Sequence, residues 1–473
     1  MAETPLEMTS RLRRKLETRK IKARKWSDYY EGNHPLKFAS PEFRAQAGSL
    51  FDGFSDNWSA VIPDAMIERM NPLGFRLEDG TPDKAAARAW KNSECDVEIG
   101  HALLESLISG RSHALVWKPD GTNTEITFES DSQAIVEYVP GRRNVRRAGF
   151  KCWRDGDLEI STLFLPDMVY RWQRKISGDG QWTERTAGLR RSESAHFPNP
   201  IGLVPLVELQ NRGRLNMAPV SEIKKVVPLQ NGVNTLWVLT FAAADSVALP
   251  ARAVTGMDRP VREILDELGE VIGEEDLPIG RFRSDRLLWL EKPGAAIGEF
   301  SAADITQFGV IIDRLVDHIS AQTRTPSHYL VGRMANVGVD AFSQNEAGLV
   351  AKVKRTHKQA GASLRELMRI EALAAGEPKR AEALRMGEVI WRDPQFRSDS
   401  QYADALTKLK AINIPDEALW EFIPGATPEM IERWKKMRDD QAAAIVGGSL
   451  GSLFGPKPDP AEEAGAEPTA EAA

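Results

Sequence analysis

The sequence predicts an α+β protein, in which helices and antiparallel strands occupy separate stretches of the chain. Residues 113–174 hold six short apolar runs separated by turn sequences, which is typical of antiparallel strands. Long helical patterns cover residues 221–247 and 304–375. Between them, residues 251–303 contain only short elements. The chain should therefore carry a small α/β module between two long helices.

Composition limits the classes of protein that the chain can belong to. Its 473 residues suggest about three domains, and 42% apolar with 27% charged residues is typical of a core-forming protein. The net charge of -6 gives no overall reason to bind nucleic acid, so such binding would need a local patch. Cys95 and Cys152 are too few for a disulfide framework or a zinc site. No signal peptide fits the start, and the longest apolar run, 236–244, is too short to span a membrane.

The first helices are predicted at residues 5–31 and 55–70, the second interrupted near Pro63. The first is basic, with nine Lys or Arg residues between Arg11 and Lys25. After the six strands, residues 199–211 read as a loop that leads into one more strand. Helical elements therefore come before the sheet region in the chain.

The middle of the chain reads as a long helix over 221–247, kinked at Pro228 and Gly232. The module that follows is predicted as a strand (ARAV), a short helix (VREILDELGEVI), a strand (LLWLE) and a loop. A helix then returns from Asp304. Its apolar residues alternate at spacings of three and four, as in a helix seam: Ile305, Phe308, Ile312, Leu315 and Ile319.

That seam predicts partners for the returning helix. Each of these side chains would lose about 1.5 to 3 kcal/mol if it stayed in water. Packing against the outgoing helix covers one side of a two-helix stalk but leaves its flanks open. Repeated subunits side by side are the simplest cover, so we expect a homo-oligomer.

Further along, the returning helix ends at Thr325-Pro326, and a loop bracketed by Gly332 and Gly338 follows. Ser343 and Glu346 have the spacing of a capping box, which predicts the start of the next helix. That helix should end at Gly376, with a last strand at 389–394. Residues 398–446 are predicted helical, 447–455 a glycine-rich linker, and the acidic end of the chain disordered.

A search for catalytic motifs finds no P-loop, no G-x-G-x-x-G behind a strand and no H-E-x-x-H. Asp313 and Asp317 lie one helical turn apart and could hold Mg²⁺ in a nuclease, although the exposed side of the helix favours a solvated pair. We expect no enzyme and no cofactor. A basic run on the later helix is either a solvated face or a contact with a phosphate backbone: Lys352, Lys354, Arg355 and Lys358.

Taken in order, the landmarks resemble the portal proteins of tailed double-stranded DNA phages, particularly the type common in phages of actinobacteria. The resemblance covers about residues 20–440 and rests on the following motifs: Trp26-x-x-Tyr29-Tyr30-x-Gly32, Asn57-Trp58, Gly74-Phe75-Arg76, Trp90-Lys91-Asn92, Asn199-Pro200 with Val204-Pro205, Ser221 with Val226, Leu229 and Gln230, Pro250-Ala251-Arg252 with Gly256, Thr325-Pro326-Ser327-His328-Tyr329-Leu330, and Trp391-Arg392-Asp393-Pro394. One departure is the sequence NVGVDAFS, where the family pattern would have a Ser-Gly-rich run before an Ala.

The resemblance implies a ring, typically of twelve subunits, with a mixed α/β wing, a two-helix stem, a small α/β clip, a tunnel loop and a helical crown. The implied parts are a wing at 1–220, an outgoing stem helix at 221–248, a clip at 249–303, a returning stem helix at 304–330, a tunnel loop at 331–342, a long wing helix with the last strand at 343–397, a crown at 398–450 and a disordered acidic tail at 451–473. The DNA-facing residues of the tunnel loop would be Arg333, Met334, Asn336, Val337 and Asp340.

The implied function is a channel at the unique capsid vertex for DNA packaging and ejection. Its partners would be the terminase motor, the head-tail adaptor, the major capsid and scaffold proteins, and double-stranded DNA without sequence specificity, with no membrane. The protein would be assembled in the host cytoplasm and reside in the virion. Two alternatives stay open: a minor capsid or adaptor protein of the same particles, and, less favoured, a metal-dependent nuclease using Asp313 and Asp317.

Overall fold

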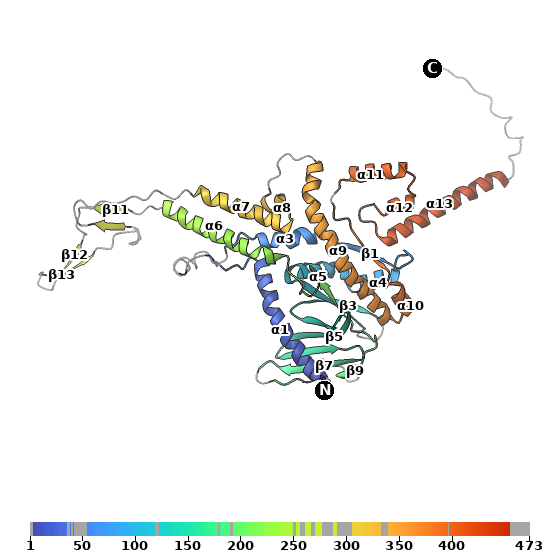
Figure 1. Cartoon of the computed structure of the whole chain (residues 1–473), viewed down its shortest axis with the longest axis horizontal. Helices are drawn as coiled ribbons and strands as arrows, with labels where there is room; N and C mark the ends of the chain where they lie inside the picture. The colour runs from blue at the N-terminus through green and yellow to red at the C-terminus, as the bar shows by residue number, and fades with distance from the viewer. Residues whose placement is uncertain are drawn as a thin grey trace, which may run out of the picture.

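The computed structural model describes residues 3–35, 38, 41, 54–118, 123–177, 180–189, 193–248, 252–255, 261–265, 270–276, 287–290, 305–332, 339–395 and 397–454. The molecule has a body of helices and sheets from which helices α6 and α7 project together as an arm (Figure 1). Short strands lie beyond the far end of the arm, and helix α13 extends from the opposite side of the body. The place where α6 and α7 join the body is called the root of the arm below. Described elements that lie far apart in the sequence meet there.

Helix α1, Pro5–Tyr30, begins with a capping box in which Thr4 and Glu7 each bond the other's backbone N–H. Its bounds confirm the predicted first helix. The helix buries Met8, Leu12 and Leu16 against apolar residues of the sheet beneath it, including Phe150. Burial of these apolar side chains therefore holds the basic helix against the sheet.

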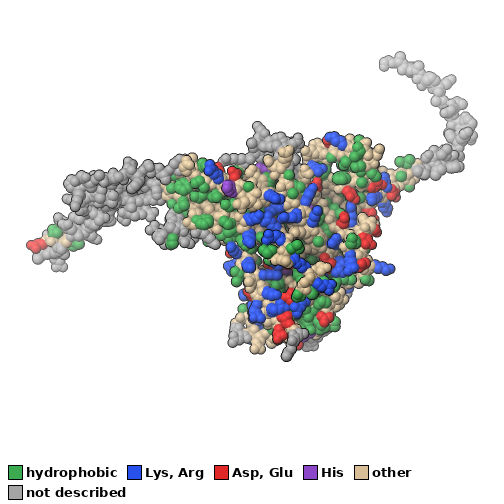
Figure 2. All heavy atoms as spheres, in the orientation of Figure 1, with side chains coloured by type: hydrophobic (Ala, Val, Ile, Leu, Met, Phe, Trp, Pro, Cys, Tyr) green, Lys and Arg blue, Asp and Glu red, His purple; other side chains and the backbone are tan. Residues whose placement is uncertain are grey.

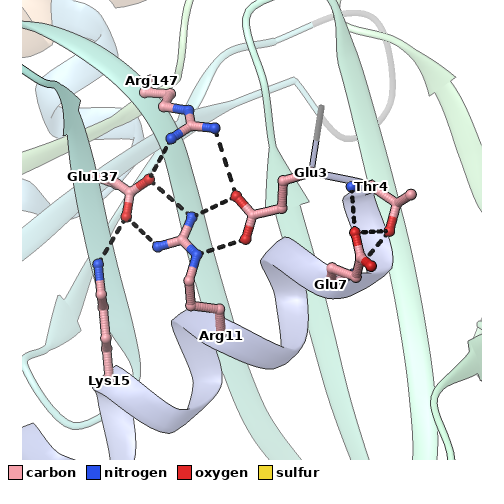
Figure 3. Close-up of polar contacts among 7 residues, drawn as sticks. All are labelled: Glu3, Thr4, Glu7, Arg11, Lys15, Glu137 and Arg147. Atoms are coloured by element: carbon pink, nitrogen blue, oxygen red, sulfur yellow. Dashed lines mark hydrogen bonds and ion pairs between the residues drawn. The ribbon is translucent and has the colours of Figure 1, made fainter. Parts of the chain in front are cut away.

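Charged side chains beside the stripe fasten α1 to the sheet (Figure 3). The Arg11 guanidinium donates to Glu3 at 2.6 Å and to Glu137 at 2.5 Å, while Lys15 lies 3.0 Å from Glu137. The hydrogen bond from Arg11 lowers the pKa of Glu137 to about 2. Arg147 joins the same group through Glu137 and Glu3. Part of the basic run is therefore paired within the chain.

The strands form two main sheets rather than one. The first has the order β10-β2-β3, from β2 (Arg111–Trp117), β3 (Glu125–Ser130) and β10 (Leu206–Gln210). The second has the order β4-β5-β6-β7-β8, with β9 also paired to β7; these are β4 (Ala134–Val139), β5 (Arg142–Asp155), β6 (Leu158–Phe164), β7 (Met168–Lys175), β8 (Thr183–Glu184) and β9 (His196–Pro198). Leu115, Val136, Phe164 and Leu206 pack between the sheets. The six strands predicted from residue 113 to residue 174 and the later strand are confirmed.

Helices cover the first sheet and make the largest core. They are α3 (Trp58–Ile67), α4 (Lys84–Asn92), α5 (Cys95–Ser109), α9 (Val339–Ala375) and α10 (Pro378–Ala383). The last strand, β15 (Glu388–Trp391), is confirmed and pairs with β1 (Pro72–Arg76). The predicted interruption at Pro63 is wrong, because α3 runs through it. Sequence patterns also missed α4, α5 and β1 as elements.

Two predicted helix boundaries are corrected. Helix α9 begins at Val339, so Ser343 lies inside the helix and does not open it. Helix α6, Val227–Ala248, follows a short 3-10 turn, η2 (Ile223–Lys225), and Pro228 is its second residue rather than a kink. Proline is tolerated there because the first turn of a helix needs no backbone donor from it. The helical character of both segments is confirmed.

The module beyond the arm differs from the prediction in one element. Its strand β11 (Arg252–Thr255) pairs in parallel with β14 (Leu287–Leu290), which confirms both predicted strands. The predicted helix VREILDELGEVI is wrong, because its sequence forms the antiparallel strands β12 (Val261–Leu265) and β13 (Val271–Asp276). Val261 and Ile264 in one strand and Val271 in the other are β-branched residues, which suit a strand better than a helix.

The C-terminal helices are α11 (Asp399–Ala411), α12 (Asp416–Trp420) and α13 (Pro428–Phe454). Thr427 caps α13 by accepting from the Met430 backbone N–H at 3.2 Å. The helix includes residues 447–454, so the predicted linker is wrong over that stretch. Residues 455–473 of the acidic tail lie outside the described part. Among the described helices, none is apolar over a length that would cross a bilayer.

Candidate functional site

The root of the arm is an apolar cluster built from four helices and the turn before α6. Helix α3 contributes Ile62, and α7 (Thr306–Thr323) contributes Ile312, Val316 and Ile319. The other buried members are Val226, Val233 and Leu330. Of the predicted seam, Ile312 and Ile319 are 5% and 0% exposed, Leu315 packs against the cluster, and Ile305 and Phe308 are half-buried.

The face that α7 buries is turned slightly from the predicted seam. Val316, which the seam left out, is 3% exposed, and the buried positions run Ile312, Val316, Ile319 and Thr323. This spacing is the ordinary helical stripe of period 3.6. Opposite it, Gly232 of α6 has no side chain, and a Cβ there would lie 3.4 Å from Leu315 Cδ1. The two helices therefore approach closely at this level.

Polar side chains of α6 fix the same root from a second side. The Gln230 side chain accepts from the Trp58 backbone N–H at 2.8 Å, and the Asn231 side chain accepts from the Tyr29 hydroxyl at 3.0 Å. Asn234 lies 2.8 Å from His34 Nδ1, and burial lowers the pKa of that histidine. Because buried amides are costly without partners, these bonds specify how the arm leaves the body.

A second set of polar side chains connects the two helices on either side of residues 333–338. Arg69, just after α3, donates to the Tyr329 hydroxyl of α8 (Ser327–Val331) at 2.5 Å and to the Glu346 carboxylate of α9 at 2.9 Å. Glu346 is 3% exposed, so it serves this contact and not the predicted capping box. Sequence analysis missed Arg69, because no local pattern connects it with residues more than 250 positions away.

The predicted tunnel-loop residues lie mostly outside the part of the chain that the structure describes. Arg333, Met334, Asn336 and Val337 lie outside the described residues, and Asp340 is described only as part of the first turn of α9. Asp313 and Asp317 both lie on the exposed side of α7. In the described part of the chain, no three His, Cys, Asp or Glu side chains are grouped so that they could hold a metal ion.

The predicted basic run on α9 is divided by the fold. Lys354, Arg355 and Lys358 are exposed, but Lys352 is only 4% exposed. Its ammonium lies 2.8 Å from Glu222 and donates to the Thr323 carbonyl at 3.1 Å. The structure therefore contradicts a solvated position for Lys352, because helical periodicity turns it inward while its neighbours point outward.

The carboxylate of Glu222 is shared between two cations. Arg212 Nε lies 2.8 Å from it, in addition to Lys352, and the Asn211 amide donates to it at 3.0 Å. Burial would raise the pKa of Glu222, but Lys352 and Arg212 outweigh burial and hold it below its ordinary value. Sequence analysis missed Glu222, whose partner Lys352 lies 130 positions further along the chain.

The burial of His357 of α9 against β15 can be tested by measuring stability as a function of pH. Its ring stacks on Trp391 of β15 at 4.3 Å, and burial lowers its pKa to about 4 from 6.5. Between these values the unfolded chain binds a proton that the folded chain does not, so stability falls as the pH falls. Replacing His357 with Phe should flatten the dependence of unfolding free energy on pH by about 1 kcal/mol per pH unit in that window.

Urea unfolding at a series of pH values between 4 and 6.5 measures this slope. The matched control is His101→Gln, because the His101 side chain is 71% exposed. We expect this control to leave the slope unchanged. Equal slopes for His357→Phe and the unaltered chain would contradict the buried, neutral histidine.

Comparison with known proteins identifies the class. The family profile "Phage portal protein, SPP1 Gp6-like" matches residues 10–444, so the chain belongs to this family of phage portal proteins. The resemblance predicted from the ordered motifs is therefore confirmed, and with it the function as a portal protein.

Two curated relatives carry the name portal protein. That of Mycobacterium phage L5 is 27% identical over 415 residues, which are 84% of this chain and 80% of the relative. That of Mycobacterium phage D29 is 26% identical over 453 residues, which are 91% of this chain and 88% of the relative.

Solved structures of gene transfer agent particles are also similar. A chain in the neck of an empty particle, computed with C6 symmetry, has a TM-score of 0.41 at 10% identity, covering 80% of this chain and 92% of that chain. A chain in the neck of a native particle, computed with C12 symmetry, has a TM-score of 0.39 at 9% identity, covering 81% of this chain and 93% of that chain.

Proposed function

We propose that the chain performs the portal function as a ring at the unique capsid vertex, through which DNA enters during packaging and leaves during ejection. The observation that carries this proposal is the arm of α6 and α7. Val310 and Ile311 of α7 are 45% and 46% exposed, and hydrophobic side chains gather on the face of the arm seen in Figure 2. Two helices cannot cover each other's flanks, but neighbouring copies in a ring of about twelve can.

The elements divide among the parts of a portal as follows. Residues 1–220 and the long helix with its last strand at 343–397 form the wing; 221–248 and 304–330 form the stem; 249–303 form the clip; 331–342 form the tunnel loop; 398–450 form the crown; and the acidic tail follows. In this division, the apolar cluster of α3, α6, α7 and α8 holds the stem against the wing.

DNA that moves through the ring must not be held tightly. Each phosphate that a protein neutralises releases counterions and adds to affinity, so a channel loop should carry little charge. Residues 331–342 contain only Arg333 and Asp340 as charged residues, and Met334, Asn336 and Val337 offer near-neutral contact. These five residues are the proposed DNA-facing contacts. Lys354, Arg355 and Lys358 remain candidates for backbone contact without sequence specificity.

Other proteins of the particle dock on the ring, and one of them supplies ATP hydrolysis. The clip docks the terminase motor during packaging and the head-tail adaptor afterwards, while the wing contacts the major capsid and scaffold proteins. The motor hydrolyses ATP, so the purified chain should show no turnover of its own. The ring is assembled in the host cytoplasm and stays in the virion.

Electron micrographs of the purified full-length chain test the proposal. We expect rings with a central channel, and Ile311→Asp should prevent them while the subunit stays folded, because a carboxylate would be buried against a neighbouring arm. Met386→Asp is the control, since Met386 is 72% exposed and lies outside the arm. A monodisperse monomer, or particles without a channel, would favour a minor capsid or adaptor protein instead.

A further inference from the structure

A cavity with an unusual concentration of positive charge lies at the root of the arm. Its volume is about 220 Å³, and it lies between the end of α7, the first half of α9 and the segment after β10. The lining residues are Arg212, Lys225, Gln322, Arg324, Ala351, Lys352 and Arg355. Five of these seven side chains are cationic. Lys and Arg side chains also gather over the middle of the body in Figure 2.

The charge in this cavity is not balanced within the described chain. Glu222 is the carboxylate that pairs with its lining residues, and it already binds Lys352 and Arg212. In the residues that the structure describes, Lys225, Arg324 and Arg355 form no ion pair with a carboxylate. Lys225, Arg324 and Arg355 are exposed and can be solvated by water, and together with Lys352 and Arg212 they give the cavity a positive excess that would attract an anion.

Backbone conformation at two lining positions decides which substitutions can test this cavity without unfolding the chain. Arg212 and Arg324 have φ values of 50° and 57°, in the left-handed region that favours glycine. Only Glu94, Asn216 and Asn413 share this property among the other described non-glycine residues. At both positions the chain carries an arginine where glycine would be less strained. Arg324 is the C-cap of α7, where a left-handed residue ends the helix, so glycine can replace it without disturbing the backbone.

We propose that this cavity binds a phosphate group. Guanidinium groups present several N–H donors in a fixed fork that matches phosphate oxygens, and lysine ammonium groups add charge. Arg212 uses its Nε for Glu222, which leaves its terminal nitrogens as donors for a ligand. A tetrahedral phosphate can accept from several of these donors at once, whereas a single carboxylate offers fewer acceptors. The phosphate belongs either to a DNA backbone or to free inorganic phosphate.

Isothermal titration of the full-length chain with inorganic phosphate, at constant ionic strength, tests the proposal. We expect saturable binding that weakens by about tenfold or more in the double variant Arg324→Gly with Arg355→Gln. Glycine at position 324 removes the charge and also suits the left-handed backbone, so loss of binding should not come from unfolding. Urea unfolding of the double variant should confirm that its stability is retained.

The matched control is the double variant Asn413→Gly with Lys379→Gln. It places glycine at another left-handed position and removes an exposed charge of α10, both outside the cavity. The control should bind phosphate as the unaltered chain does. Absence of saturable binding to the unaltered chain, or equal binding by the cavity variant, would overturn the proposal.

Competition with a short blunt DNA duplex identifies the source of the phosphate. Displacement of inorganic phosphate by the duplex would assign the site to the DNA backbone, and binding without displacement would assign it to free phosphate. Both outcomes support a phosphate site. If the cavity variant instead lost ring assembly while the unaltered chain bound no phosphate, the cavity would receive a carboxylate of a second copy, and the proposal would fail. Phosphate binding does not require a ring, so this test is independent of the portal proposal.

Discussion

Replacing Glu222 with alanine is expected to destabilise the folded chain by about 3 to 5 kcal/mol, because it leaves buried cations without their carboxylate. Lys352 and Arg212 both lie 2.8 Å from Glu222, and the side chains of Glu222 and Lys352 are 1% and 3% exposed. Without Glu222, the Lys352 ammonium keeps only the Thr323 carbonyl as a partner, whereas the Arg212 side chain is 19% exposed and can be partly solvated. Urea unfolding, followed by circular dichroism, measures the loss.

The control for this prediction is Glu382→Ala. Glu382 pairs with Arg385 at 3.2 Å, but their side chains are 72% and 60% exposed, and such surface pairs contribute about 1 kcal/mol or less. The single variant Lys352→Met should cost less than Glu222→Ala, since Arg212 and Asn211 still serve the carboxylate. Equal losses for Glu222→Ala and Glu382→Ala would show that Glu222 is not buried among cations.

Local patterns predicted the elements that local interactions determine. The capping box of α1 uses Thr4 and Glu7, which lie three positions apart, and the six strands are separated by turn sequences that can be read directly. The pairing of β1 with β15 joins residues more than 300 positions apart. No periodicity within one segment reports such a contact. The same limit hid Arg69 and Glu222.

Where local preferences for helix and strand conflict, contacts with distant parts of the chain determine which one forms. The sequence from Val261 to Ile272 has helix-forming Glu and Leu residues but also β-branched residues near each end, and its described residues form antiparallel strands. The basic run of α9 shows a related limit. Its charges predicted an exposed face, yet helical periodicity turns Lys352 inward, and its partner Glu222 at the start of η2 comes from a distant segment.

For the functional site, the sequence supported a class more firmly than individual residues. The ordered motifs from Trp26 to Pro394 predicted the portal family, which the profile match confirms. The tunnel-loop residues remain predictions, because they follow from the resemblance and lie largely outside the described part. The cationic cavity was not predicted at all, since Arg212, Lys225, Arg324 and Arg355 come from three separate segments that only the fold brings together.

The arm's attachment predicts the other large effect. Replacing Ile319 with alanine is expected to cost about 2 to 5 kcal/mol of unfolding free energy, through lost burial and the cavity left behind. Ile319 is 0% exposed and lies in the cluster with Ile62, Val233 and Leu330. These residues belong to different helices, so their side chains cannot easily close the gap. Urea unfolding of the full-length chain is the measurement.

Ile311 on the same helix provides the control that separates folding from assembly. Ile311 is 46% exposed, so Ile311→Ala should change the stability of the isolated subunit little, because it removes few buried contacts. In the ring, the same change should weaken contacts between arms. If Ile319→Ala were as harmless to the subunit as Ile311→Ala, α7 would not be packed on the body through its Ile312, Val316 and Ile319 face. The arm would then owe its position to neighbouring subunits alone, and an isolated subunit should show α7 unprotected from amide hydrogen exchange.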